Sequence, residues 1–192
     1  MTKTEENLLA ALAGESQANR KYLAFAKKAE IEGFPEVAHL FRAAAAAETI
    51  HAHNHLRALD GIKSTEENLK EAIGGEFYEF TEMYPEFIDD AKAEGHSRAE
   101  RSFKYANEVE KVHHKLYENA LKSVEKAKDL EETNIYICSV CGYTNRTLLN
   151  NLISFLQSLN LYILPHCNNI QLILKRIGHL LKKKEFVILL LL

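Results

Sequence analysis

The first 130 residues show the spacing of polar and apolar positions that is typical of long amphipathic helices. Apolar side chains recur every three or four positions, among many alanine, glutamate, lysine and leucine residues. Breaks at Gly33, Gly61 and Gly95 divide this stretch. The pattern predicts helices over residues 3–32, 35–59, 65–94 and 97–128. Three of them begin with a capping-box pattern, in which Ser or Thr precedes Glu by three positions: Thr2 and Glu5, Ser64 and Glu67, and Ser97 and Glu100.

Each predicted helix carries acidic or imidazole side chains near the middle of its apolar face. The first and third helices each place one glutamate there, and the second and fourth each place a Glu-x-x-His pair. These residues are Glu15, Glu48 with His51, Glu76, and Glu110 with His113. Four helices with apolar faces and short connections pack as an antiparallel bundle. We therefore expect an all-α fold with these polar side chains inside the bundle.

The sequence also contains an internal repeat. A shift of 62 positions carries Gly33 onto Gly95 and the first Glu-x-x-His onto the second. A shift of 61 positions carries Gly14-Glu15 onto Gly75-Glu76. The repeat predicts two helical hairpins of common pattern that pack with approximate two-fold symmetry.

The clustered carboxylates require a cation. Five buried glutamates, counting Glu79, would each cost several kcal/mol as ions even after the protein relaxes. Two divalent cations would compensate most of this charge, and oxygen-rich ligation with two imidazoles suits iron or manganese more than structural zinc. A single Glu-x-x-His is common on a Glu-rich helix surface, but two at the repeat offset on apolar faces are not. A pairing of His51 with His55, four positions apart, is a second way to bind metal.

The charge distribution argues against nucleic-acid binding by the helical part. The formal net charge is −3, and of 27 acidic residues only Glu185 lies beyond residue 144. The helical part is therefore acidic, which is unfavourable next to phosphates. Three cysteines are too few for a secreted disulfide framework, the first residues lack the apolar stretch of a signal peptide, and no apolar run reaches about 18 residues. We expect a cytoplasmic protein without a membrane span.

Four segments of the chain resemble the rubrerythrin family. They are LAGESQANRKY, EIEGFPEVAHLFRAAAAAETIH, GEFYEFTEMYPEF and ICSVCGYT, and the similarity covers about residues 1–144. The resemblance implies a ferritin-like four-helix bundle over residues 1–130 that holds two irons, oxo- or carboxylate-bridged. The iron ligands that it implies are Glu15, Glu48, His51, Glu76, Glu79, Glu110 and His113.

The resemblance also implies roles within this di-iron centre. Glu48 and Glu110 would bridge the irons, and one iron would exchange between His51 when reduced and Glu79 when oxidised. Tyr22 and Tyr84 resemble the family's tyrosines that hydrogen-bond the carboxylates, although aromatic packing explains these two residues equally well. The catalytic residues expected on this basis are Glu79, His51, Tyr22 and Tyr84.

The function that the resemblance implies is the reduction of hydrogen peroxide to water in oxidative-stress defence. Electrons would come from a rubredoxin or a rubredoxin reductase-type donor, in an NADH peroxidase-type chain, because the sequence has no Gly-x-Gly-x-x-Gly to bind a nicotinamide itself. Family members pair as homodimers, so a homodimer is expected. Two other interpretations share the bundle: a ferritin-like ferroxidase that handles iron, and a bundle in which metal has only a structural role.

The segment at residues 131–144 resembles half of a rubredoxin-type site, in which four thiolates hold one iron. Cys138-Ser-Val-Cys141 supplies two thiolates, but the sequence has no second Cys-x-x-Cys, and Cys167 stands alone. Cys138 and Cys141 could hold a further Fe or Zn, form a redox pair, or have no role.

Residues 145–192 differ in composition from the rest of the chain. No alanine occurs beyond Thr144, and leucine and isoleucine make up 21 of the last 48 residues. This composition is typical of AT-rich codons read out of frame, so we interpret the segment as an out-of-frame tail. The alternatives are a helical lid or a membrane-surface segment that uses Lys182, Lys183 and Lys184.

Overall fold

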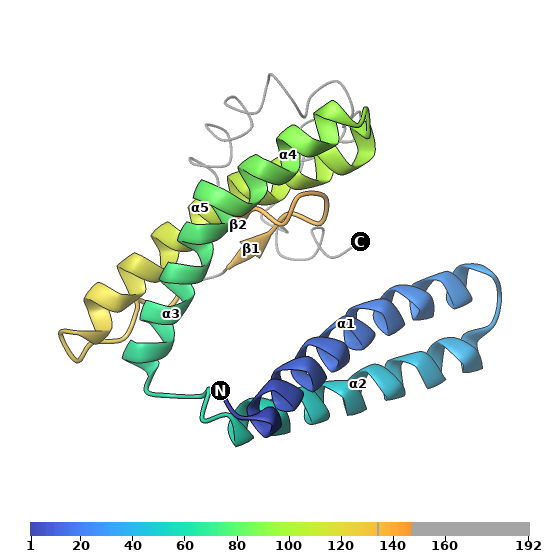
Figure 1. Cartoon of the computed structure of the whole chain (residues 1–192), viewed down its shortest axis with the longest axis horizontal. Helices are drawn as coiled ribbons and strands as arrows, with labels where there is room; N and C mark the ends of the chain where they lie inside the picture. The colour runs from blue at the N-terminus through green and yellow to red at the C-terminus, as the bar shows by residue number, and fades with distance from the viewer. Residues whose placement is uncertain (134, 147–192) are drawn as a thin grey trace, which may run out of the picture. The chain divides into compact units, whose positions relative to one another are not determined.

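The chain is mostly helical in a computed structural model, which describes residues 1–133 and 135–146. Its elements are α1 (Lys3–Ile31), α2 (Pro35–Ala58), α3 (Thr65–Tyr78), the π-helical turn η1 (Glu79–Met83), α4 (Tyr84–Ala93), α5 (Ser97–Val124), β1 (Tyr136–Ile137) and β2 (Thr144–Asn145) (Figure 1). The predicted helix boundaries agree with these to within four residues. The helical class of the fold is therefore confirmed. Of the predicted tail at residues 145–192, only Asn145 and Arg146 are among the described residues, and Asn145 belongs to β2.

The described chain divides into two compact units. One contains residues 1–72 and 120–128, and the other contains residues 73–119 and the described residues from 129 to 146. The first unit holds the hairpin of α1 and α2. The second holds most of the hairpin formed by α3, η1 and α4 with α5, together with the short β-hairpin.

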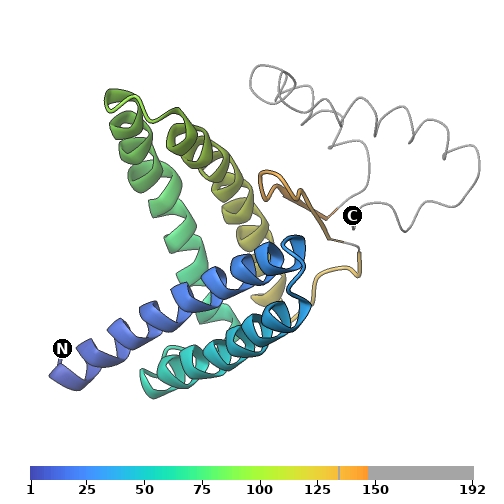
Figure 2. The same cartoon turned by 90° about the vertical axis from the view of Figure 1, so that its right-hand side faces the viewer.

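The α1–α2 hairpin begins and turns where the sequence predicts it. Thr2 and Glu5 form the capping box at the start of α1. Gly33 adopts a φ of +84°, and the Phe34 N–H donates to the Ala29 carbonyl over 2.9 Å, so the helix ends in a left-handed residue that glycine adopts at no cost. Pro35 then opens α2. In Figure 2, α1 (blue) and α2 (cyan) run side by side as an antiparallel pair.

Small side chains make the contact between these two helices. Ala26 and Ala29 of α1 and Ala38 of α2 are buried together, and Phe41 packs against them. Phe41 also contacts Phe25, at a ring-centroid distance of 5.6 Å. Because alanine lets helix backbones approach closely, the hairpin holds its polar side chains in a fixed register.

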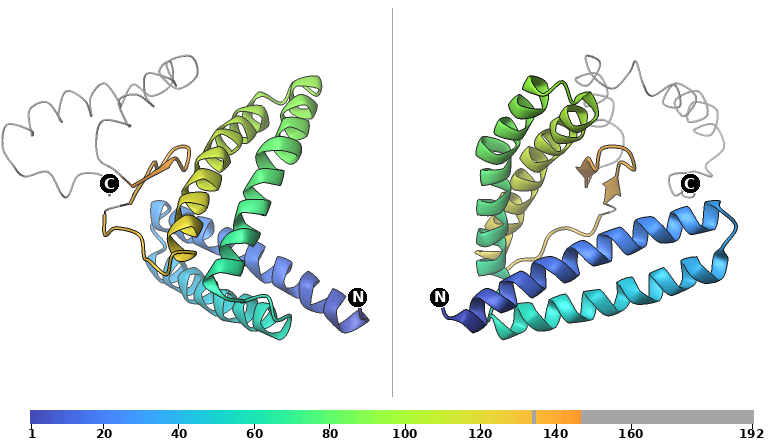
Figure 3. Two further views of the ribbon diagram at one scale, coloured as in Figure 1. Left: turned by 90° about the vertical axis from the view of Figure 1, so that its left-hand side faces the viewer. Right: turned by 45° about the vertical axis from the view of Figure 1, so that its right-hand side comes forward.

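The second hairpin is held by aromatic contacts. Phe103 of α5 packs against Tyr84 and Phe87 of α4, with ring centroids 6.3 and 5.5 Å apart. Nearer the β-hairpin end, the ring of His114 of α5 lies 5.5 Å from that of Phe80. The green and yellow-green helices of Figure 3 show this second pair. Such aromatic pairs favour tilted and edge-on arrangements of the kind seen here.

The predicted third helix is interrupted by a π-helical turn, which the periodicity did not reveal. The Tyr84 N–H donates to the Glu79 carbonyl, five residues back. Pro85 follows directly and has no N–H to donate to the carbonyl four residues back, which weakens α-helical hydrogen bonding at this point. The widened turn starts at Glu79, and π-turns of this kind are frequent at functional sites.

One predicted helix cap is wrong. Ser64 and Glu67 do form a capping box at α3, with the Glu67 N–H donating to Ser64 Oγ over 3.3 Å. At α5, however, Ser97 is already helical, and the Ala99 N–H donates instead to His96 Nδ1 over 3.3 Å. His96 takes over the cap because it follows Gly95, whose φ of +70° ends the preceding helix.

None of the helices in the described part of the chain combines the length and apolar character that crossing a lipid bilayer requires.

Candidate metal centre

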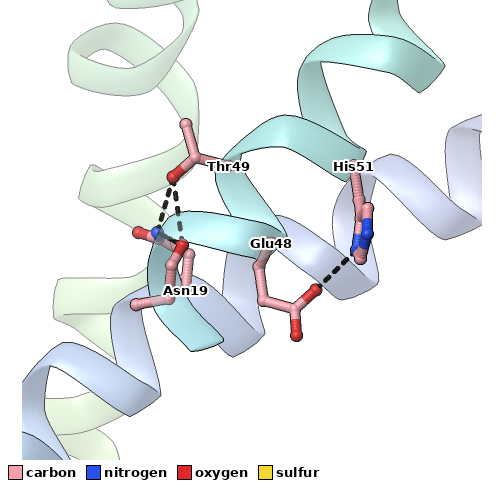
Figure 4. A network of polar contacts seen from close by, with 5 residues as sticks. Asn19, Glu48, Thr49 and His51 are labelled. Carbon is pink, nitrogen blue, oxygen red and sulfur yellow. Dashed lines mark hydrogen bonds and ion pairs between the residues drawn. The ribbon is translucent and has the colours of Figure 1, made fainter. Parts of the chain in front are cut away.

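The first carboxylate–histidine cluster lies on the α1–α2 hairpin. Glu15 comes from α1, Glu48 and His51 come from successive positions on one side of α2, and one ligand atom from each lies within 4.8 Å of the others. His51 Nδ1 lies 3.0 Å from Glu48 Oε2 (Figure 4). The hydrogen bond from His51, followed by that from Glu15, lowers the pKa of Glu48. The alternative pairing partner His55 is not part of this cluster among the described residues.

A buried amide fixes α1 against α2 beside this cluster. Asn19 is 7% exposed, and its Nδ2 donates to the Ala45 carbonyl over 2.6 Å and to Thr49 Oγ1 over 2.9 Å (Figure 4). Thr49 follows Glu48 directly, so the amide holds the α2 turn from which Glu48 projects. The spacing of polar and apolar residues does not single out Asn19, whose one signal in the sequence is a polar amide between alanine and arginine.

The second cluster lies on the hairpin of α3 and α5. Glu76 of α3 and Glu110 and His113 of α5 bring one ligand atom each within 4.8 Å of the others. His113 Nδ1 lies 2.7 Å from Glu110 Oε2 and 3.9 Å from Glu76 Oε1. Each cluster thus contains two glutamates and one histidine, taken from equivalent positions of the sequence repeat.

Electrostatics make the second cluster a good cation site. Burial raises the pKa of Glu76 to about 7, and the hydrogen bond and charge of Glu110 add to this rise. Burial and then the charge of Glu110 also raise the pKa of Glu79, while His113 partly offsets the effect. Adjacent carboxylates away from bulk water favour either a shared proton or a bound cation. The donor set therefore fits a divalent metal ion.

Thr144 of the β-hairpin orients the imidazole of the second cluster. Its Oγ1 lies 2.9 Å from His113 Nε2 and donates to the Gly142 carbonyl over 3.1 Å. The network assigns the Nε2 proton to a hydrogen bond toward Thr144, because the hydroxyl proton is already given to Gly142. The Nδ1 lone pair of neutral His113 then faces Glu110 and Glu76, as metal ligation requires. Thr144 could not be predicted from the sequence, since a contact between residues 31 positions apart leaves no periodic signal.

The two tyrosines with expected catalytic roles have different surroundings. Burial, followed by the charges of Glu79, Glu110 and Glu76, raises the pKa of Tyr84. Tyr84 therefore lies in the field of the second cluster. Tyr22 packs against Phe41, with ring centroids 6.0 Å apart. Among the described residues, no hydrogen bond joins either hydroxyl to the carboxylates, so their catalytic roles stay predictions.

The cysteine pair is brought together by the β-hairpin. Cys138 and Cys141 are both half-buried free thiols, and they hydrogen-bond to each other. Cys167 lies outside the described residues. The structure thus brings these two thiols together, and metal binding by them stays a prediction.

These clusters are typical of helical proteins that bind metal through carboxylates and imidazoles on paired helices. The rubrerythrin family model matches residues 6–121, and the chain belongs to the rubrerythrin family. Rubrerythrin-2 of Clostridium acetobutylicum is 37% identical over 155 residues, which cover 73% of this chain and 84% of that protein. Nigerythrin of Nitratidesulfovibrio vulgaris is 37% identical over 157 residues, which cover 74% of this chain and 76% of that protein.

The solved structures that are similar to this chain include nigerythrin in a mixed-valent state. The likeness covers 76% of this chain and 78% of the nigerythrin chain at 36% identity, with a TM-score of 0.42. Another structure of nigerythrin shows its fully reduced, all-ferrous state, with a TM-score of 0.41. The family assignment rests on the sequence matches.

Proposed function

We propose that this protein is a non-haem di-iron peroxidase that reduces hydrogen peroxide to water in oxidative-stress defence. The observation that carries the proposal is the pair of matched Glu–Glu–His clusters on the hairpins of a rubrerythrin-family chain. A single such cluster is an ordinary surface feature, but two at repeat-equivalent positions supply the ligand set of a carboxylate di-iron centre. The donor set supports iron as the metal, because oxygen-rich ligation with two imidazoles suits iron or manganese.

The proposed ligands of the two irons are the six cluster residues and Glu79, in an antiparallel ferritin-like bundle. Bound ferrous iron would supply the two electrons that cleave the O–O bond of peroxide. The protein itself supplies charge compensation and a hydrogen-bond donor. The clustered carboxylates would balance the charge of the bound irons. Tyr84, beside the same carboxylates, keeps its proton and can donate a hydrogen bond.

The rest of the cycle depends on partners outside the chain. We propose a rubredoxin or a rubredoxin reductase-type protein as electron donor, because Cys138 and Cys141 provide only half of an internal four-thiolate iron site. We further propose a homodimer in a reducing cytoplasm. The proposed domains are the bundle at residues 1–130, the partial knuckle at 131–144 and the atypical tail at 145–192.

Stopped-flow mixing of the reduced, iron-loaded protein tests this function. The proposal predicts fast oxidation by hydrogen peroxide and slow oxidation by oxygen. The rise in absorbance of ferric iron follows the reaction. Faster oxidation by oxygen than by peroxide would instead identify a ferroxidase that handles iron. Iron that reacts with neither oxidant would leave only a structural role for the metal.

Two variants of the π-helical turn sharpen the test at the level of single residues. Glu79→Gln should retain both irons but change peroxide turnover several-fold, since Glu79 is proposed to exchange with His51 as an iron ligand. Glu82→Gln is the matched control, because Glu82 is exposed in the same turn. Equal turnover in the two variants would remove Glu79 from the mechanism.

A further inference from the structure

The β-hairpin that carries Cys138 and Cys141 is a closed and anchored turn. β1 and β2 pair antiparallel, with Ile137 opposite Thr144. Between them, the Cys138 N–H donates to the Tyr143 carbonyl and the Gly142 N–H donates to the Cys138 carbonyl, each over 2.9 Å. Gly142 has a φ of +80°, which a side chain would strain. The backbone therefore fixes the separation of the two thiols.

Contacts outside the turn hold this β-hairpin in place. The Arg146 guanidinium donates to the Glu131 carbonyl over 2.6 Å, and Thr133 Oγ1 donates to the Arg146 carbonyl over 2.6 Å. Both contacts tie the end of β2 to the segment that leads into β1. The two thiols thus lie on a turn that is hydrogen-bonded across its strands and to the segment before it.

The two thiols lie within hydrogen-bonding reach of each other and are half-buried. Cys138 Sγ also accepts the backbone N–H groups of Cys141 and Val140, and Cys141 Sγ accepts the backbone N–H of Tyr143. Two neighbouring cysteines of this kind are the arrangement found in peroxide-sensing and dithiol redox sites.

A four-thiolate metal site does not account for this pair within one chain. Such a site needs a second Cys-x-x-Cys, and the sequence contains only one further cysteine, Cys167 after Pro165 and His166. Two neighbouring thiols on one turn, without a second Cys-x-x-Cys in the given sequence, favour disulfide formation over a four-thiolate metal site within one chain.

We propose that Cys138 and Cys141 form a second redox site, a dithiol that is oxidised to a disulfide by hydroperoxides independently of the iron centre. The Cys138 sulfur attacks one peroxide oxygen, the O–O bond breaks, and the other oxygen takes up a proton and leaves as water. Cys138 is then a sulfenic acid. The Cys141 sulfur attacks the Cys138 sulfur, the S–O bond breaks, and the hydroxyl leaves as a second water with the Cys141 proton. A dithiol reductant returns two electrons and two protons and becomes a disulfide itself.

Thiol counting on the full chain tests this proposal. The reduced protein is treated with hydrogen peroxide, quenched with an alkylating reagent, and mapped by mass spectrometry of peptides. The proposal predicts the loss of both Cys138 and Cys141 from the alkylated pool, a peptide that contains the disulfide, and full recovery with dithiothreitol. The result should be the same in a Glu110→Ala variant with an impaired iron centre, which separates this site from the proposed peroxidase.

Three cysteine variants assign the roles. Cys167→Ser is the matched control and should leave the disulfide unchanged. Cys141→Ser should stop at a Cys138 sulfenic acid, which dimedone traps, and Cys138→Ser should abolish the reaction. Circular dichroism verifies that each variant keeps its helices.

Three outcomes would overturn the proposal. Cys138 and Cys141 could both stay alkylatable after peroxide, or the disulfide could instead involve Cys167. The purified protein could also hold one metal ion for two chains that both Cys138→Ser and Cys141→Ser release, which would identify a four-thiolate site shared between copies.

Discussion

The two carboxylate–histidine clusters have the same residue types but different surroundings. On the α1–α2 hairpin, the His51 side chain is 53% exposed and Glu48 has a lowered pKa. On the other hairpin, the His113 side chain is 27% exposed, and Glu76 has a pKa raised to about 7. The second cluster therefore depends more on a cation or a proton to balance its charge, because burial weakens the effect of water on each carboxylate.

The difference shows which properties of the two clusters follow from the sequence repeat and which depend on their surroundings. The repeat fixes which residue types converge, because positions three apart lie on one side of any helix. The surroundings come from non-repeated elements: Asn19 fixes the first cluster's hairpin, and Thr144 holds the histidine of the second. We therefore expect substitutions of the clusters and of these supports to have unequal effects.

The largest effect is expected from removing a proposed bridging carboxylate of the more buried cluster. Glu110→Ala should lose at least one iron per chain and reduce peroxide turnover by more than the roughly 10- to 100-fold typical of losing an outer-shell partner. The control is Glu108→Ala, since Glu108 is exposed on the same helix and pairs with Lys111. Elemental analysis and peroxide consumption measure both properties, and equal iron content in the two variants would disprove the assignment.

A smaller effect, a loss of stability, is expected when the amide that joins α1 to α2 is removed, and the other hairpin should show no such loss. Asn19→Ala removes a buried amide that donates twice across α1 and α2, and should lower the free energy of unfolding by about 1–3 kcal/mol. Thr81, an exposed residue on the other hairpin, donates its hydroxyl to the Phe77 carbonyl of its own turn, so its hydrogen bond joins no two helices. Thr81→Ala should therefore change stability by less than about 0.5 kcal/mol. Urea unfolding followed by circular dichroism compares them, and equal losses would contradict the difference between the hairpins.

Removing the hydroxyl that orients His113 should weaken metal binding at the second cluster alone. Thr144→Val loses the acceptor for the Nε2 proton, so affinity for a divalent ion should fall by about 10-fold, at the low end for an outer-shell partner. Thr144→Ser keeps the hydroxyl and should restore binding. Titration of the metal-free protein with Fe(II) or Co(II) measures this. If valine and serine variants bind equally well, the hydrogen bond does not position the ligand.

The smallest expected effect is a pH dependence of the metal-free protein. Between the ordinary pKa of a glutamate and the value of about 7, folded Glu76 holds a proton that the unfolded chain has released. Stability should therefore fall as pH rises through this window, by about 1 kcal/mol once solvent screening is allowed for. Glu76→Gln should remove this slope, whereas Glu15→Gln should retain it. Urea midpoints at several pH values give the slopes, and a wild-type slope unchanged by Glu76→Gln would contradict the account.

The helices could be predicted from the sequence because helix ends depend on contacts between residues that are close together in the chain. Thr2, Ser64 and the glycines at 33 and 95 act through contacts within a few residues. The two Glu-x-x-His pairs could be predicted equally well, since helix geometry alone places the two side chains of each pair together. The site residues converge as expected within each hairpin, while their joint occupation by two irons is a proposal.

The features that could not be predicted from the sequence depend on a choice between alternative local hydrogen bonds or on contacts between distant residues. His96 and Ser97 can both accept the cap hydrogen bond of α5, and His96 accepts it because it lies between Gly95, which ends the preceding helix, and the first helical residue. The π-helical turn at Glu79 needs a shift of one hydrogen bond, which leaves the apolar pattern nearly unchanged. Thr144 reaches His113 only once the β-hairpin has folded.

Diffraction from crystals of the iron-loaded protein, recorded at the iron absorption edge, tests the central claim most directly. The account predicts two anomalous peaks per chain, one beside Glu15, Glu48 and His51 and one beside Glu76, Glu110 and His113. Iron located elsewhere, or no peak beside either cluster in a crystal of iron-loaded protein, would contradict it.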